Sequence, residues 1–146
     1  MLTVEAMQLE DLDAVHSIEE DSFSVPWTRE SLRKELTDNK HAIYITAKEN
    51  GKVLGYAGLW HVVTEGHITN IAVKAGCRRR GIGDTLLKEL EKIARAKEMM
   101  GLTLEVRVGN EQAMRLYAKN GFEIEGIRKN YYPDTKEDAV IMWKYL

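Results

Sequence analysis

The sequence has few of the features that mark secreted, membrane-bound or metal-binding proteins. Its only cysteine is Cys77, so an internal disulfide framework is excluded. No apolar run reaches the roughly 18 residues that a membrane helix needs, and residues 1–10 carry no hydrophobic signal core. The four histidines and Cys77 show no metal-ligand spacing. We therefore expect a cytoplasmic protein with no membrane association and no metal.

Positive charge is also in short supply. The 21 Lys and Arg residues are outnumbered by 23 Asp and Glu residues, which gives a net charge of −2. Affinity for a nucleic-acid backbone depends on excess positive charge, so no direct nucleic-acid partner is expected. The cations are instead concentrated locally, because Lys74, Arg78, Arg79 and Arg80 fall within seven positions.

What is present indicates one α/β domain that spans residues 1–146. No repeat, low-complexity tract or linker divides the chain, and 146 residues can bury a sizeable core. Apolar periodicity predicts the element order β-α-α-β-β-β-α-β-α-β-β. The expected strands are residues 2–7, 41–48, 52–63, 65–73, 102–108, 122–128 and 138–145, and the expected helices are residues 9–20, 29–37, 82–99 and 110–121. The central strand-helix-strand unit implies one parallel pair in a mixed, mostly antiparallel twisted sheet with flanking helices.

Short-range signals predict several of the boundaries between these elements. Pro26 biases the residue before it away from helix, and Thr28 is placed to cap the second helix. The pair Asn50-Gly51 is a strong hairpin signal. Gly101 is expected to cap the C-terminus of the third helix.

The stretch from residue 71 to residue 87 has the pattern of an anion-binding loop. Apolar β-branched residues end a strand before it, and an amphipathic helix begins at Ile82. Gly81 and Gly83 remove Cβ atoms at the turn, so main-chain N–H groups can approach a ligand. The positive end of the helix dipole and three arginines converge there. This arrangement suits a pyrophosphate, although the same residues could form only a solvated basic turn before an ordinary helix.

With this element order, the sequence resembles the GNAT superfamily of acetyltransferases over essentially the whole chain. The acetyl-coenzyme A signature of that superfamily, Arg/Gln-x-x-Gly-x-Gly/Ala, is matched by the residues RRRGIG at positions 78–83. A narrower resemblance, to RimI-type ribosomal-protein-alanine N-acetyltransferases, rests on ordered motifs in both halves. These motifs are Ile18-Glu19, Pro26-Trp27, Leu104-Glu105-Val106-Arg107, Asn110, Ala113, Leu116-Tyr117, Gly121-Phe122, Arg128, Tyr131-Tyr132-Pro133 and Asp138-Ala139.

The resemblance implies direct transfer of an acetyl group from acetyl-coenzyme A, as cosubstrate, to the N-terminal amino group of a protein. The implied acceptor is the N-terminal alanine of a small-subunit ribosomal protein. By the same resemblance Glu105 is the catalytic base, and Tyr117 is the acid that protonates the departing thiolate. The implied coenzyme contacts are Ile71, Ala72, Val73, Arg78, Arg79, Arg80, Gly81, Ile82, Gly83, Asp84, Asn110 and Tyr117. Many relatives fill the position of Arg80 differently, which leaves its individual role open.

The chemistry of amide formation is compatible with these roles. A thioester reacts with a neutral amine, so one group must take the amine proton and another must protonate the leaving sulfur. An α-amino group has a pKa of about 8 and a free glutamate about 4.3, so direct transfer is uphill by roughly 3.5 units unless the site or ordered water helps. A lysine side chain, at about 10.4, is the harder acceptor.

Each catalytic assignment has a structural alternative in the sequence. Glu105 could be a solvated residue on a half-exposed strand, and Tyr117 could be an aromatic residue at the edge of the core. Asn110 could cap its helix whether or not it contacts the coenzyme.

Two loops are expected to form the acceptor groove. Tyr131 and Tyr132, before Pro133, form one wall, and Phe23 and Trp27 form the opposite wall. The tyrosine pair could instead be only a rigid turn. Two other functions also remain open, namely acetylation of a small amine or lysine side chain, and a non-catalytic module that binds coenzyme A.

Overall fold

The computed structural model describes residues 1–146 as a seven-stranded sheet with four α-helices. The strands are β1 (Leu2–Ala6), β2 (Ala42–Glu49), β3 (Lys52–Val62), β4 (Glu65–Val73), β5 (Gly101–Arg107), β6 (Glu123–Arg128) and β7 (Ala139–Tyr145). The helices are α1 (Leu12–Ser22), α2 (Arg29–Thr37), α3 (Ile82–Ala96) and α4 (Glu111–Lys119), and a short 3₁₀ helix, η1 (Leu9–Asp11), precedes α1. Strand order is β1-β2-β3-β4-β5-β7-β6, and only β4 and β5 are parallel. The predicted mixed sheet with one central parallel pair is confirmed.

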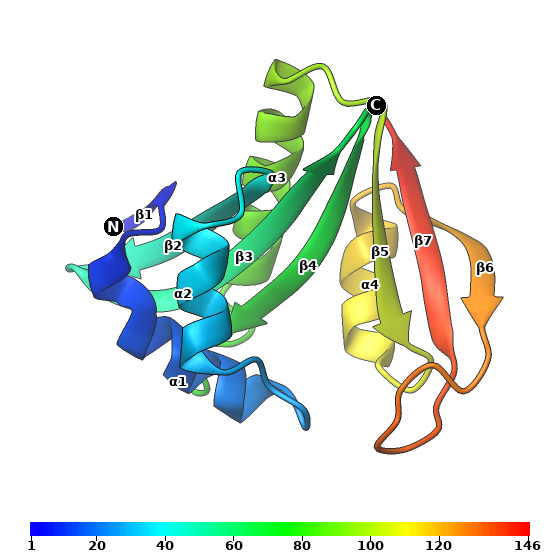
Figure 1. The fold of residues 1–146 in the computed structure, drawn as a ribbon, viewed down its shortest axis with the longest axis horizontal. Helices are drawn as coiled ribbons and strands as arrows, with labels where there is room; N and C mark the ends of the chain where they lie inside the picture. Colours follow the sequence, from blue (N-terminus) through cyan, green and yellow to red (C-terminus); the bar gives the residue numbers. More distant parts are fainter.

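Helices cover both faces of the sheet, with α1 and α2 in front and α3 and α4 behind it in Figure 1. Leu86 and Leu90 of α3 belong to the larger of two buried apolar clusters. Val15 of α1 and Leu32 of α2 belong to the smaller one. The central strands are therefore buried on both sides. None of the helices is both long enough and apolar enough to cross a membrane.

Three of the short-range signals act as predicted. Thr28 accepts a hydrogen bond from the Ser31 N–H at 3.1 Å and so caps α2. Asn50 and Gly51 have φ values of 53° and 77°, the positive values that a two-residue hairpin turn needs. Asn110 caps α4 by accepting from the Ala113 N–H at 3.1 Å.

The prediction that Gly101 caps α3 is wrong. The helix ends at Ala96, and the residue with left-handed backbone after it is Glu98, with a φ of 58°. Gly101 is the first residue of β5 instead. A Cβ atom there would lie 3.0 Å from the Lys144 carbonyl oxygen of β7, so the close approach of two strands explains this glycine.

The parallel strands β4 and β5 separate soon after they meet. They pair only between residues 65–67 and 101–103. A register shift between Gly58 and Leu59 of β3 leaves Thr69 as an extra residue on β4, and a bulge of this kind bends a strand. Beyond the bulge β4 pairs with β3 alone and β5 pairs with β7 alone. A wedge therefore opens between the two strands (Figure 1).

The space around two strand glycines, Gly58 at the bulge and Gly126 on β6, predicts that alanine substitutions at them differ in their effect on stability. A Cβ atom on Gly58 would collide with the Tyr44 ring and lie 2.7 Å from Thr69 Oγ1, whereas one on Gly126 would meet nothing closer than 3.7 Å. We expect Gly58→Ala to lower the free energy of unfolding by about 1–3 kcal/mol through overpacking. Gly126→Ala, the matched control, should change it by less than about 0.5 kcal/mol. Urea denaturation measures both values, and equal midpoints would contradict this account of Gly58.

Candidate functional site

Two adjoining cavities occupy the wedge between β4 and β5. The first, of about 490 Å³, lies at the start of α3 and along α4, and we call it the α3 cavity. The second, of about 520 Å³, lies beneath the α1–α2 and β6–β7 loops, and we call it the loop cavity. Six residues line both of them, namely Ser22, Phe23, Ile71, Asn110, Ala113 and Tyr117. The two cavities therefore adjoin around Tyr117.

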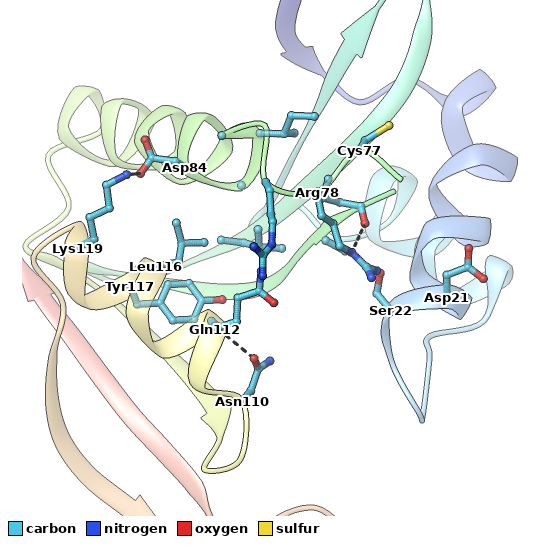
Figure 2. A pocket seen from close by; sticks show the side chains of 18 of the residues that line it. Asp21, Ser22, Cys77, Arg78, Asp84, Asn110, Gln112, Leu116, Tyr117 and Lys119 are labelled. Carbon is cyan, nitrogen blue, oxygen red and sulfur yellow. Dashed lines mark hydrogen bonds and ion pairs between the residues drawn. The ribbon is translucent and has the colours of Figure 1, made fainter. Parts of the chain in front are cut away.

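The α3 cavity contains nearly all of the residues predicted to bind the coenzyme. They are Ile71, Ala72, Val73, Arg78, Arg79, Gly81, Ile82, Gly83, Asp84, Asn110 and Tyr117. Figure 2 shows Arg78, from the loop before α3, facing Asn110 and Tyr117, from the start and the body of α4, across this space. Residues that are separated in sequence thus meet in one opening.

The N-terminus of α3 offers unpaired donors to this cavity. Gly81 precedes the helix with a φ of 78°, a left-handed conformation that suits glycine. The first helical hydrogen bond runs from the Thr85 N–H to the Gly81 carbonyl oxygen at 3.0 Å. The N–H groups of Ile82, Gly83 and Asp84 therefore have no partner within the helix. With Arg78 and Arg79 beside them, these donors form an environment that favours an anion.

Asp84 is the one acidic side chain in the first turn of α3, and its charge is compensated. A hydrogen bond from Lys88, and a second from Asn120 Nδ2 at 2.9 Å, hold the pKa of Asp84 below its usual range. Lys119 Nζ lies 3.7 Å from the same carboxylate (Figure 2). The carboxylate thus joins α3 to the end of α4, while the backbone N–H of Asp84 remains available to a ligand.

Arg80 is the predicted coenzyme residue that the structure places elsewhere. Its guanidinium donates to Glu49 Oε2 on β2 at 2.8 Å, and it lines neither cavity. Consecutive residues in a loop point in different directions, so three adjacent arginines do not share one role.

The loop cavity brings together most of the residues predicted for the acceptor and for catalysis. Phe23, Trp27, Tyr132, Glu105 and Tyr117 all line it. Glu105 Oε1 lies 3.4 Å from Arg128 Nε, an ion pair on the side facing β6. Glu105 and Tyr117 thus line one continuous space.

Tyr131, the remaining predicted acceptor residue, lies outside both cavities. Its ring packs edge-on against Tyr132, with 5.1 Å between the ring centroids, and its side chain is largely exposed. Burial, and then the nearby charge of Glu105, raise the pKa of Tyr131. Tyr131 therefore supports the wall that Tyr132 forms rather than lining it.

Arg107 was not among the predicted site residues, yet it links the two walls of the loop cavity. Its Nη2 donates to Ser24 Oγ at 3.2 Å in the α1–α2 loop and to Asp134 Oδ2 at 3.0 Å in the β6–β7 loop. The Ser24 hydroxyl also donates to Asp134, at 2.5 Å. The guanidinium lies 4.0 Å from the centroid of the Tyr132 ring. Because Arg107 follows Glu105 by two positions on a strand, their side chains share a face, and this spacing could have indicated it.

Tyr117 lies where the two cavities adjoin, and the pKa of its hydroxyl is raised. Burial, and then the proximity of Tyr132, raise the pKa of Tyr117 to about 12. Its ring packs against Phe122 with 5.9 Å between centroids, which fixes its direction. The hydroxyl is therefore held in its protonated, donating form.

Comparisons with known proteins agree with this geometry. Residues 12–122 match the model of the "Acetyltransferase (GNAT) family". The chain is 45% identical, over 96% of its length and 93% of the relative, to a Bacillus subtilis (strain 168) protein provisionally named a [ribosomal protein bS18]-alanine N-acetyltransferase. It is 34% identical, over 97% of its length and 96% of the relative, to the [Ribosomal protein bS18]-alanine N-acetyltransferase of Escherichia coli (strain K12).

A solved structure gives the same result for the fold. The ribosomal-protein-S18-alanine N-acetyltransferase from Escherichia coli superposes with a TM-score of 0.91 at 33% identity, covering 99% of this chain and 94% of that one. The chain therefore belongs to the GNAT family and is an acetyl-coenzyme A-dependent N-acetyltransferase.

Proposed function

We propose that this enzyme acetylates the N-terminal amino group of a protein, and that its acceptor is the N-terminal alanine of ribosomal protein bS18. The observation that carries the proposal is the junction of the two cavities at Tyr117. A donor in one cavity and an amine in the other can meet there without a covalent enzyme intermediate. The names of relatives at 45% and 34% identity support bS18 as the acceptor. The proposal also implies a cytoplasmic location, where ribosomal proteins are made.

The α3 cavity is the proposed binding site for acetyl-coenzyme A. The N–H groups at the start of α3, with Arg78 and Arg79, suit its pyrophosphate. The edge of β4 that faces the wedge is free of β5 beyond residue 67, so its backbone groups can bond the pantetheine arm. Acetyl-coenzyme A bound in this cavity would have its thioester directed toward Tyr117.

In the proposed reaction Glu105 carries out one proton transfer and Tyr117 carries out the other. The amine nitrogen attacks the thioester carbonyl carbon, a C–N bond forms, and the C–S bond breaks. Glu105 takes the amine proton, directly or through water, and the Tyr117 hydroxyl gives a proton to the departing sulfur. Both residues line the loop cavity, and Tyr117 also lines the α3 cavity, which supports this division of roles.

The arginines at the start of α3 provide a direct test of the coenzyme-binding site. We expect Arg78→Ala to raise the KM for acetyl-coenzyme A about ten-fold, the effect of losing one charge-assisted hydrogen bond. Arg80→Ala, the matched control, should leave that KM within about two-fold, because Arg80 pairs with Glu49 outside the cavity. Steady-state kinetics with a fixed peptide measures both. Equal effects of the two substitutions would refute the proposed binding site.

A panel of acceptors tests the function itself. We expect an alanine-starting bS18 peptide to be acetylated much faster than Nα-acetyl-lysine or a polyamine, because the α-amine is the easier group to deprotonate. The same peptide with a blocked N-terminus should not be acetylated at that end, because it has no α-amine. Glu105→Gln and Tyr117→Phe should each lower kcat by about 10²–10⁴-fold. Glu123→Gln and Tyr145→Phe, exposed counterparts, should not. Wild-type turnover in Glu105→Gln or Tyr117→Phe would remove that residue from the mechanism.

The raised pKa of Tyr117 predicts the shape of the pH profile. We expect kcat/KM to rise as the α-amine loses its proton at about pH 8 and then to stay level past about pH 10. An acid group whose pKa is raised to about 12 keeps its proton throughout that range. Rates should be taken after a brief exposure to each pH, with return to neutral pH as a check on unfolding. A reversible fall centred at about pH 10, the ordinary value for tyrosine, would contradict the role of Tyr117.

A further inference from the structure

A buried carboxylate, Glu19 of α1, lies at the border of the loop cavity. Its side chain is among the most buried in the protein, with 1% of the residue exposed. Three donors face it, namely the Tyr56 hydroxyl, the Trp27 N–H at 2.9 Å and Asn70 Nδ2 at 3.1 Å. Such a set of donors is what a carboxylate requires. Glu19 therefore ties the α1–α2 loop to β3 and β4.

The bond from Asn70 fixes the orientation of that amide. A carboxylate only accepts, so the NH₂ group of Asn70 has to face Glu19, and its oxygen points elsewhere. That oxygen, Oδ1, is buried and has no hydrogen-bond partner in the protein. Asn70 is 5% exposed and lines the loop cavity. Asn70, a residue of the cavity wall, thus carries an acceptor atom whose bonding capacity is unused.

Ser22, one turn after Glu19 on α1, repeats this situation. Its hydroxyl is buried without a partner, and the residue lines the loop cavity. The protein has three such buried side-chain atoms, and the third, Thr46 Oγ1, belongs to a residue that lines neither cavity. Buried polar groups are normally paired, so two unpaired groups in one cavity wall indicate a ligand.

The charge of Glu19 indicates what kind of ligand fits. No basic side chain forms an ion pair with it. A buried carboxylate that is hydrogen-bonded but has no cation beside it favours an approaching positive group. The amino end of a peptide brings a positive charge and N–H donors together.

We propose that Glu19, Ser22 and Asn70 form the subsite that receives the amino end of the acceptor peptide. Asn70 Oδ1 and Ser22 Oγ accept hydrogen bonds from the N–H groups of the first residue. Glu19 is a positioning residue that orients Asn70 and stabilises the positive charge of the arriving amine. This inference deepens the proposed function and rests on it, because it concerns the same acceptor.

Ser22→Ala gives the sharpest test, because it separates binding from folding. Removing an unpaired buried hydroxyl should leave the melting temperature unchanged or raise it, since no bond in the free protein is lost. The KM for the alanine-starting peptide should nevertheless rise about ten-fold, while the KM for acetyl-coenzyme A stays within about two-fold. Thr46→Val is the matched control, because it removes the third unpaired hydroxyl and should change neither KM.

Glu19→Gln and Asn70→Ala extend the test to the other two members. Both should raise the KM for the peptide about ten-fold or more and leave the KM for acetyl-coenzyme A within about two-fold. Tyr56→Phe removes the hydroxyl group that donates to Glu19. Because Tyr56 does not line the loop cavity, this variant controls for the effect of lost stability alone. If Glu19→Gln fails to fold, the peptide KM values of Ser22→Ala and Asn70→Ala still test the proposed subsite.

The outcomes separate this inference from the proposed function. An unchanged peptide KM in Ser22→Ala and Asn70→Ala, with an active wild-type enzyme, overturns the subsite alone. A rise in the KM for acetyl-coenzyme A in Ser22→Ala would assign that hydroxyl to the donor and also overturn the proposal. If the wild-type enzyme acetylates only small amines, the proposed function fails, and the same variants measured with that amine then show whether the subsite holds an amino group.

Discussion

The site depends on one constraint in the sheet, which is that the parallel ladder between β4 and β5 stops after three residue pairs. A bulge at Thr69 turns β4 away, and each strand keeps its partner on the other side. The exposed strand edge offers backbone groups to a ligand, and the helices and loops on the two faces give two separate routes to one opening. A continuous ladder would have given a more regular sheet with nowhere for two substrates to meet.

The polar groups around the wedge differ from one another in how far they are paired within the protein. Asp84 has Lys88 and Lys119 beside its carboxylate and accepts a hydrogen bond from Asn120, so its repulsion of an anion is reduced. Ser22 and Asn70 instead keep unused hydrogen-bonding capacity beside the loop cavity. Under the proposed function, the backbone donors and arginines of the α3 cavity would hold the anionic coenzyme, and the acceptors and carboxylate of the loop cavity would hold the amine. This opposition of charge matches the two substrates of an acetyl transfer from coenzyme A to an amine.

The features that sequence could predict are those decided within a few residues or by a long periodic pattern. Thr28, Asn50-Gly51 and Asn110 act on neighbouring backbone groups, so the sequence alone was enough to predict their roles. Gly101 was misread because the strand that crowds it, β7, is distant in sequence. Arg80 and Tyr131 share motifs with cavity residues, but a motif does not fix where each side chain points. Glu19 appeared in the sequence only as part of the Ile18-Glu19 motif, because only the fold brings Tyr56 and Asn70 to it.

The bridge that Arg107 makes between Ser24 and Asp134 has a consequence for how such an enzyme diverges. The two loops come from opposite ends of the chain, yet the Arg107 guanidinium and a direct hydrogen bond from Ser24 to Asp134 hold them to each other. A substitution in either loop is therefore felt by the other, and neither can be remodelled alone. A lineage that adopts a new acceptor has to replace both loops together or give up the arginine, so acceptor preference should change in steps rather than by gradual drift.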